Sequence, residues 1–418
     1  MTELQKIAAK LKANPIYALS LGSRELFHTN LLAWLFINYP QTVSLFTEAE
    51  TSRDIKVERE KHNLDLILKF ADGDKKKAIV IEFKVKDAPR SEQLERYDET
   101  IQKHIPADTN VEKILISLVE APQDIQEHSS WDYLSLGCLG EKLTAVTHQS
   151  VSAIPPAHLV IIENYCELCR DLHKLTQEIL NSDEETRIYF LPKKRDLAQI
   201  RRTQGPSNDQ IAEDIRFGDT LNKYRASLMA SALSKEIGDQ RFNDLRLDIE
   251  HGFDRKNAHV GATLIWSNEE KPKLRLSLGI HIQGAQYRRI IAFSEFKVAT
   301  RSQGKNEERM KRFIDATDQW NWLFGGSHEN GYFLDPSAKR GYFVNHQKIA
   351  TRMQRNKTIC SYAPIYLYQY ANIGYADYEV KPEEVTQAVV ADIQHARTLL
   401  SDSEYLDRYL NWYDVTGF

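Results

Sequence analysis

The chain has 418 residues, more than one hydrophobic core ordinarily holds, which predicts two or three domains. Its 55 lysines and arginines against 59 aspartates and glutamates give a formal net charge of −4, which argues against a protein that coats nucleic acid through bulk positive charge. No apolar run approaches the roughly 20 residues of a membrane-spanning helix, and the N-terminus lacks a signal-peptide pattern. With only four scattered cysteines, we expect a cytoplasmic protein without a disulfide framework or a membrane partner.

Helical and strand-like periodicities alternate through the first 120 residues. In chain order they predict a helix over 23–37, strands over 54–61, 64–70 and 78–86, a helix over 91–105 and a buried strand over 113–119. Asp72-Gly73 marks a hairpin turn between the second and third of these strands. The order αβββαβ predicts an α/β fold in which helices cover a mixed sheet.

The residues beyond about 150 give a less definite pattern. We expect a first domain over 1–185, a basic linker over 186–208 and an α+β accessory domain over 209–418 that selects substrate, partner or oligomeric state. Its strand-like runs lie at 259–266, 274–282 and 288–296, and a closing helix lies near 382–413. Basic residues cluster at 193–195, 201–202, 288–289, 301–312 and 352–357, with aromatic residues nearby at Tyr287, Trp320, Trp322, Tyr342 and Phe343. Such interleaving is typical of a surface that binds nucleic acid and equally of a solvated surface, and both readings stay open.

The hairpin over 64–86 brings two carboxylates together. Asp65 and Glu82 are equally far from the midpoint between Gly73 and Asp74, so a symmetric hairpin sets them side by side. A turn centred on Asp72-Gly73 would instead make them diagonal neighbours. Either register places two like charges on one face with Lys84, which is unfavourable unless a cation lies between the carboxylates.

Carboxylate oxygens, together with the backbone carbonyl of Phe83, suit Mg²⁺ or Mn²⁺. Lys84 would then orient or deprotonate an attacking water and stabilise charge on the phosphorane, which is the chemistry of metal-assisted phosphodiester hydrolysis. The alternative is that Asp65, Glu82 and Lys84 form a solvated sheet face, where charged residues usually lie.

These residues and this element order resemble the PD-(D/E)xK nuclease superfamily, with its restriction-endonuclease-like core, over residues 20–120. Asp65 corresponds to the first acidic residue and Glu82-Phe83-Lys84 to (D/E)xK, with leucine at position 64 in place of proline. Gln93 and Tyr97, four apart on the next helix, resemble the QxxxY element of one branch, which holds the substrate backbone or orients the site. Glu25 on the first helix resembles a glutamate that reaches the metal in a bacterial stand-alone subgroup.

The resemblance implies a Mg²⁺- or Mn²⁺-dependent nuclease that acts on DNA rather than RNA, in anti-phage defence or DNA processing, as a homo-oligomer or with a defence partner. Its catalytic residues would be Asp65, Glu82, Lys84, Gln93 and Tyr97, and its metal ligands Asp65, Glu82, Phe83 and Glu25. Two alternatives remain: an RNase with the same site, and a non-catalytic nucleic-acid-binding or assembly protein that retains the fold.

Three further features have a functional and a structural interpretation. His28 could assist Glu25, but a histidine on a partly apolar helix more often packs or forms a hydrogen bond. Glu60, at the end of the first strand, is a weaker candidate for the site. Cys166 and Cys169 have the spacing of metal ligands, yet no second pair completes a zinc site, so a buried helical face is favoured.

Overall fold

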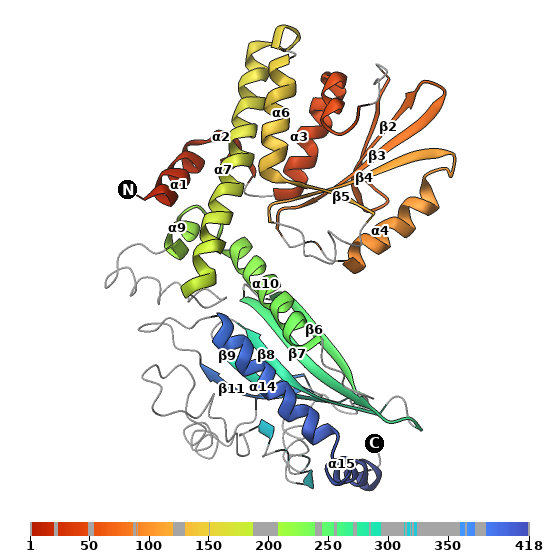
Figure 1. Cartoon of the computed structure of the whole chain (residues 1–418), viewed down its shortest axis with the longest axis vertical. Helices are drawn as coiled ribbons and strands as arrows, with labels where there is room; N and C mark the ends of the chain where they lie inside the picture. The colour runs from red at the N-terminus through yellow and green to blue at the C-terminus, as the bar shows by residue number, and fades with distance from the viewer. Residues whose placement is uncertain are drawn as a thin grey trace. The chain divides into compact units, whose positions relative to one another are not determined.

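The computed structural model forms two compact units (Figure 1). The first comprises residues 1–182 and 206–224, and the second 183–205 and 225–418. The structure describes residues 2–20, 24–48, 54–86, 89, 91–119, 130–149, 151–186, 208–238, 245–254, 257–270, 274–283, 286–293, 313, 316–317, 319, 322–323, 360–363, 366–372 and 382–416. Among the helices within these residues, none is long and apolar enough to cross a membrane.

A five-stranded mixed sheet lies at the centre of the first unit, with its strands side by side in sequence order. The strands are β1 (Lys56–Lys61), β2 (Leu64–Asp72), β3 (Lys75–Lys84), β4 (Thr109–Ser117) and β5 (Asp132–Ser135). The first three pair antiparallel, and β4 continues parallel to β3 and β5. The predicted α/β fold with a mixed sheet is therefore confirmed, with β5 added at its edge.

Helices bury this sheet on both faces (Figure 1). The helices of the first unit are α1 (Glu3–Ala13), α2 (Pro15–Ser20), α3 (Arg24–Asn38), α4 (Ser91–His104), α6 (Leu136–Gln149), α7 (Pro156–Thr186) and α9 (Asn208–Asp214), with the short 3-10 turns η1 (Pro40–Leu45) and η2 (Val151–Ala153). Helix α10 (Gly218–Gly238) begins in the first unit and has most of its residues in the second. Leu66 and Ile81 join a large core with α3, α6 and α7, while Ile67 and Val80 join a smaller core with Leu94 of α4. Alternation along each strand therefore supplies apolar residues to both faces.

The second unit contains a six-stranded antiparallel sheet in the order β10-β11-β9-β8-β7-β6. Its strands are β6 (Arg246–Asp254), β7 (Asn257–Ser267), β8 (Arg275–Gln283), β9 (Gln286–Phe293), β10 (Cys360–Ala363) and β11 (Tyr366–Asn372), with α14 (Pro382–Leu400) and α15 (Ser403–Thr416) completing it. The closing helix predicted as one is two, because the Asp402 carboxylate accepts a hydrogen bond from the Glu404 N–H and so begins a new helix.

The basic and aromatic residues around position 288 belong to the interior of the second unit. Asp392 is fully buried on α14, and its carboxylate accepts hydrogen bonds from the Arg289 guanidinium and the Tyr287 hydroxyl. Arg289 also donates to the backbone oxygen of buried Trp322, and Arg288 lies over the ring of Tyr368. The interpretation of this cluster as an exposed grip on nucleic acid is therefore wrong. The described residues do not include the basic clusters at 193–195, 201–202, 301–312 and 352–357, the aromatic residues Trp320, Tyr342 and Phe343, or residues 187–207 of the expected linker.

Candidate active site

The β2–β3 hairpin has the symmetric register that sets Asp65 opposite Glu82. Its pairs run from Asp72 with Lys75 to Leu66 with Ile81. Gly73 occupies the turn at φ +59°, a left-handed conformation that glycine adopts without steric cost. Beyond the last pair, the Asp65 carboxylate accepts a hydrogen bond of 2.8 Å from the backbone N–H of Phe83. The side chain thereby lies against the main chain between Glu82 and Lys84.

Glu82 is the centre of a chain of polar contacts that reaches α4. Its Oε1 atom accepts hydrogen bonds of 2.7 Å from both Lys84 Nζ and the Tyr97 hydroxyl. Gln93 Nε2 in turn donates to the Tyr97 hydroxyl at 2.6 Å. Because Gln93 and Tyr97 are one helical turn apart, they share the face of α4 that covers the end of β3. The structure thus brings four of the five predicted catalytic side chains into one connected cluster, and Asp65 lies beside it.

Glu25 reaches the same end of β3 from the first turn of α3. Its Oε1 atom accepts hydrogen bonds from the backbone N–H groups of Val85, at 3.2 Å, and Lys86, at 3.0 Å. The negative charge of Glu25 also contributes to raising the pKa values of Asp65 and Lys84. Glu25 therefore holds the main chain at Val85 and Lys86 through hydrogen bonds, and it adds a third carboxylate to the site.

The site is buried rather than spread over a solvated sheet face, so that alternative is wrong. Glu82 is 2% exposed and Lys84 is 7% exposed, because α4 covers this face of the sheet. Burial, followed by the nearby charge of Glu82, raises the pKa of Asp65 from 3.8 to about 7. Burial alone would lower the pKa of Lys84, but Glu82, Tyr97 and Glu25 outweigh it and raise that pKa, so the ammonium stays charged.

The donor atoms at the site suit a hard divalent cation. Glu82 Oε2 is buried and accepts no hydrogen bond from the described residues, which is costly for a carboxylate oxygen unless another ligand binds it. Three carboxylates face a single lysine here, and all are oxygen ligands of the kind that Mg²⁺ and Mn²⁺ prefer. The oxygens of Asp65, Glu82 and Glu25 are not all within 4.8 Å of one another; among the described residues a different group meets that limit.

A comparison with models of known protein families gave one match in this part of the chain. Residues 13–167 match the model of a family described as the PD-(D/E)XK nuclease superfamily. This part of the chain is therefore similar to the PD-(D/E)XK nuclease superfamily, as the residues at 20–120 indicate. The match spans the whole mixed sheet, α4 and the start of α7, and it indicates a nuclease. Searches of curated proteins and of solved structures gave no match.

The other residues singled out in the sequence of the first unit have structural rather than catalytic surroundings. His28 is 1% exposed, stacks on Phe83 at a centroid distance of 5.5 Å and shares a 2.9 Å hydrogen bond with the Tyr165 hydroxyl. Burial lowers the pKa of His28 to about 3, which keeps the imidazole neutral. Cys166 and Cys169 lie in the main core, as the buried helical face predicts. Glu60 is exposed on the edge strand β1.

Tyr224 is a positioning residue that sequence reasoning missed. Its hydroxyl donates a 2.7 Å hydrogen bond to the backbone oxygen of Val85, immediately after Lys84. Tyr224 lies on α10, 139 residues from Val85 along the chain, so no local sequence pattern predicts this contact. Together with Glu25, it holds the main chain immediately beyond the end of β3.

Asp65→Asn is expected to stabilise the metal-free protein at high pH. The folded state binds a proton at Asp65 up to a pKa of about 7, whereas the ordinary value is 3.8, so wild-type stability falls as the pH rises between these values. Asparagine retains the acceptor for the Phe83 N–H but carries no charge. Thermal unfolding in EDTA should give a higher melting temperature for the variant above about pH 7, with the difference shrinking towards about pH 4. Equal melting temperatures across this range would contradict the energetic cost of burying a charged Asp65 beside Glu82.

Proposed function

We propose that the chain is a Mg²⁺- or Mn²⁺-dependent nuclease that hydrolyses phosphodiester bonds in DNA. The buried, uncompensated oxygen of Glu82 is the observation that supports this most strongly. A buried carboxylate oxygen without a hydrogen-bond donor is costly, and at Glu82 the neighbouring carboxylates of Asp65 and Glu25 add electrostatic repulsion to that cost. A divalent cation removes that cost and supplies Lewis acidity at the scissile phosphate.

Each neighbouring residue has a distinct proposed role. Asp65 and Glu82 would hold the cation from two adjacent strands, the backbone carbonyl of Phe83 would add a third ligand, and Glu25 would contribute negative charge from α3. Lys84, kept protonated by the surrounding carboxylates, stabilises the negative charge that develops on the phosphate oxygens. This replaces proton abstraction by Lys84, which its raised pKa disfavours.

Gln93 and Tyr97 are proposed to orient Glu82 and to border the substrate backbone. The Tyr97 hydroxyl donates a hydrogen bond to Glu82 Oε1. The Gln93 amide donates to the same hydroxyl and so keeps it in this orientation. An oriented carboxylate loses less entropy when it binds a cation. A role in anti-phage defence or DNA processing, and the use of the second unit to select substrate or partner, rest on the superfamily resemblance alone.

Cleavage assays separate the proposed substrate from its alternatives. Wild-type protein is incubated with linear, circular and single-stranded DNA and with RNA, each in Mg²⁺, Mn²⁺ or EDTA. We expect metal-dependent cleavage of DNA, with cleavage of the circle reporting endonuclease action. Cleavage of RNA alone would replace the DNA proposal by an RNase. Binding of nucleic acid without cleavage in either metal would favour the non-catalytic alternative.

Two substitutions of Glu25 distinguish the effect of its hydrogen bonds to the main chain from the effect of its negative charge. Glu25→Gln keeps the oxygen that accepts from Val85 and Lys86 but removes the charge, so its melting temperature should match the wild type while metal-dependent cleavage falls by roughly 10-fold or more. Glu25→Ala also removes the acceptor and should lower the melting temperature as well. Full activity in Glu25→Gln would restrict Glu25 to support of the strand end.

A further inference from the structure

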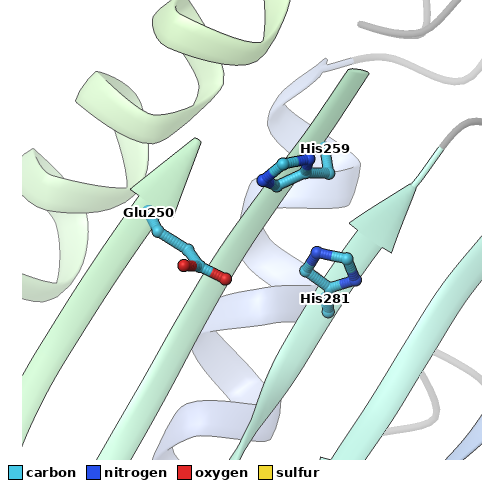
Figure 2. Close-up of side chains that lie close together, drawn as sticks. All are labelled: Glu250, His259 and His281. Carbon is cyan, nitrogen blue, oxygen red and sulfur yellow. The ribbon is translucent and has the colours of Figure 1, made fainter. Parts of the chain in front are cut away.

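The sheet of the second unit carries a group of metal-binding side chains on three neighbouring strands (Figure 2). Glu250 comes from β6, His259 from β7 and His281 from β8. Their ligand atoms all lie within 4.8 Å of one another. Glu250 is exposed and both histidines are partly buried, so the group lies at the surface with one side open to solvent.

The strand register explains why these side chains converge. Glu250 lies opposite Gly261 of β7, and Gly261 lies opposite His281, so the three form one row across the sheet. His259 precedes Gly261 by two residues and therefore shares its face. His259 itself lies opposite Gly252. The register thus sets a glycine beside each of the three ligands.

Both glycines provide space that a larger residue would fill. A Cβ atom on Gly261 would lie 3.1 Å from Glu250 Cγ, 3.2 Å from Glu250 Oε1 and 3.5 Å from His281 Cδ2. A Cβ atom on Gly252 would lie 2.8 Å from His259 Cε1. The ligand side chains consequently lean over the glycines towards a common point, as Figure 2 shows.

The packing of the core does not require these residue types. Val260, Ala262, Ile280 and Ile282, which alternate with the ligand positions along β7 and β8, belong to the core on the opposite face. The imidazole rings of His259 and His281 have centroids 5.1 Å apart and planes inclined at 40°. Two imidazoles and a carboxylate on the outer face of a sheet, with glycines below them, form a preorganised ligand set.

We propose that Glu250, His259 and His281 bind one divalent transition-metal ion, Zn²⁺ in the first instance, and leave a fourth position for water. Two imidazole nitrogens with one carboxylate suit Zn²⁺ and disfavour Mg²⁺, which requires oxygen ligands. Ligand atoms about 2.0–2.1 Å from a tetrahedral ion lie roughly 3.4 Å apart, so the side chains close by at most about 1.4 Å on binding. The site is chemically distinct from the oxygen site at Asp65 and Glu82, and it does not depend on the nuclease proposal.

Zinc titration of the full chain tests this site without reference to activity. Protein stripped with EDTA and dialysed is titrated with Zn²⁺ against a chromophoric chelator, with excess Mg²⁺ present to occupy oxygen sites. The wild type should bind one Zn²⁺ per chain, and so should His251→Gln, which alters a histidine next to Glu250 on the other face of β6. Failure of the wild type to bind Zn²⁺ would overturn the proposal.

Three variants locate the ion. His259→Ala with His281→Ala should weaken Zn²⁺ binding by at least about 100-fold, and Glu250→Gln, at an exposed position that leaves folding intact, by about 10-fold or more. Gly261→Ala keeps all three ligands but crowds Glu250, and should weaken binding by about 10-fold. Circular dichroism of the metal-free variants verifies folding. Unchanged affinity in the double variant, in Glu250→Gln or in Gly261→Ala would place the ion elsewhere and contradict the proposal.

Discussion

Glu82→Gln is expected to lower metal-dependent cleavage by about 10²–10³-fold or more. Glutamine has the size of glutamate but lacks the charge that attracts the cation. It still offers an oxygen to Lys84 and Tyr97, which contact the glutamate at 2.7 Å in the native protein. The readout is the initial rate of DNA cleavage at saturating Mn²⁺, together with the melting temperature of the same sample.

The choice of glutamine matters because the side chain is buried. At 2% exposure, alanine would leave a cavity and deprive two donors of their acceptor, so lost activity could reflect lost structure. Glu112→Gln is a matched control. Glu112 on β4 forms an ion pair with Lys77, and Lys77 lies on β3 five residues before Glu82. Cleavage by Glu82→Gln at the rate of this control would remove Glu82 from the mechanism.

Asp392→Ala is expected to destabilise the second unit by about 3–5 kcal/mol. The change leaves the Arg289 guanidinium, which is 5% exposed, without the carboxylate that it contacts at 2.8 and 3.2 Å. The Tyr287 hydroxyl loses its acceptor at the same time. Urea unfolding followed by tryptophan fluorescence measures the change, because Trp322 lies beside Arg289.

An exposed ion pair in the same unit provides the control. Glu404→Gln removes the partner of Arg408 on α15, at 2.6 Å on the surface, and should change stability by no more than about 0.5 kcal/mol. A similarly small effect of Asp392→Ala would contradict a structural role for the Arg289 cluster. It would return Arg288 and Arg289 to the set of residues available for nucleic acid.

The proximity of the candidate catalytic residues along the chain made that cluster predictable. Asp65 and Glu82 lie on the two arms of one hairpin, so strand periodicity and a single glycine turn determine their pairing. Gln93 and Tyr97 follow within one helical turn of each other on the next element. Each inference required only the local period of a strand or a helix.

Contacts between distant segments could not be predicted in this way. Asp392 lies 103 residues from Arg289, and the ligands of the proposed zinc site require the registers of two strand pairs at once. An error of one residue in either register would move a ligand to the opposite face. Burial of the candidate catalytic face could not be predicted for a related reason, because it results from the packing of Leu94 and Ile101 of α4 against strand residues of the sheet.

The most direct test of the central claim is Mn²⁺ binding at Asp65 and Glu82. Electron paramagnetic resonance of free Mn²⁺ counts the ions that the protein binds. We predict that wild-type protein binds Mn²⁺ and that Asp65→Asn combined with Glu82→Gln removes this binding while the protein remains folded. Equal Mn²⁺ binding by the two proteins would contradict a metal-dependent active site at these residues.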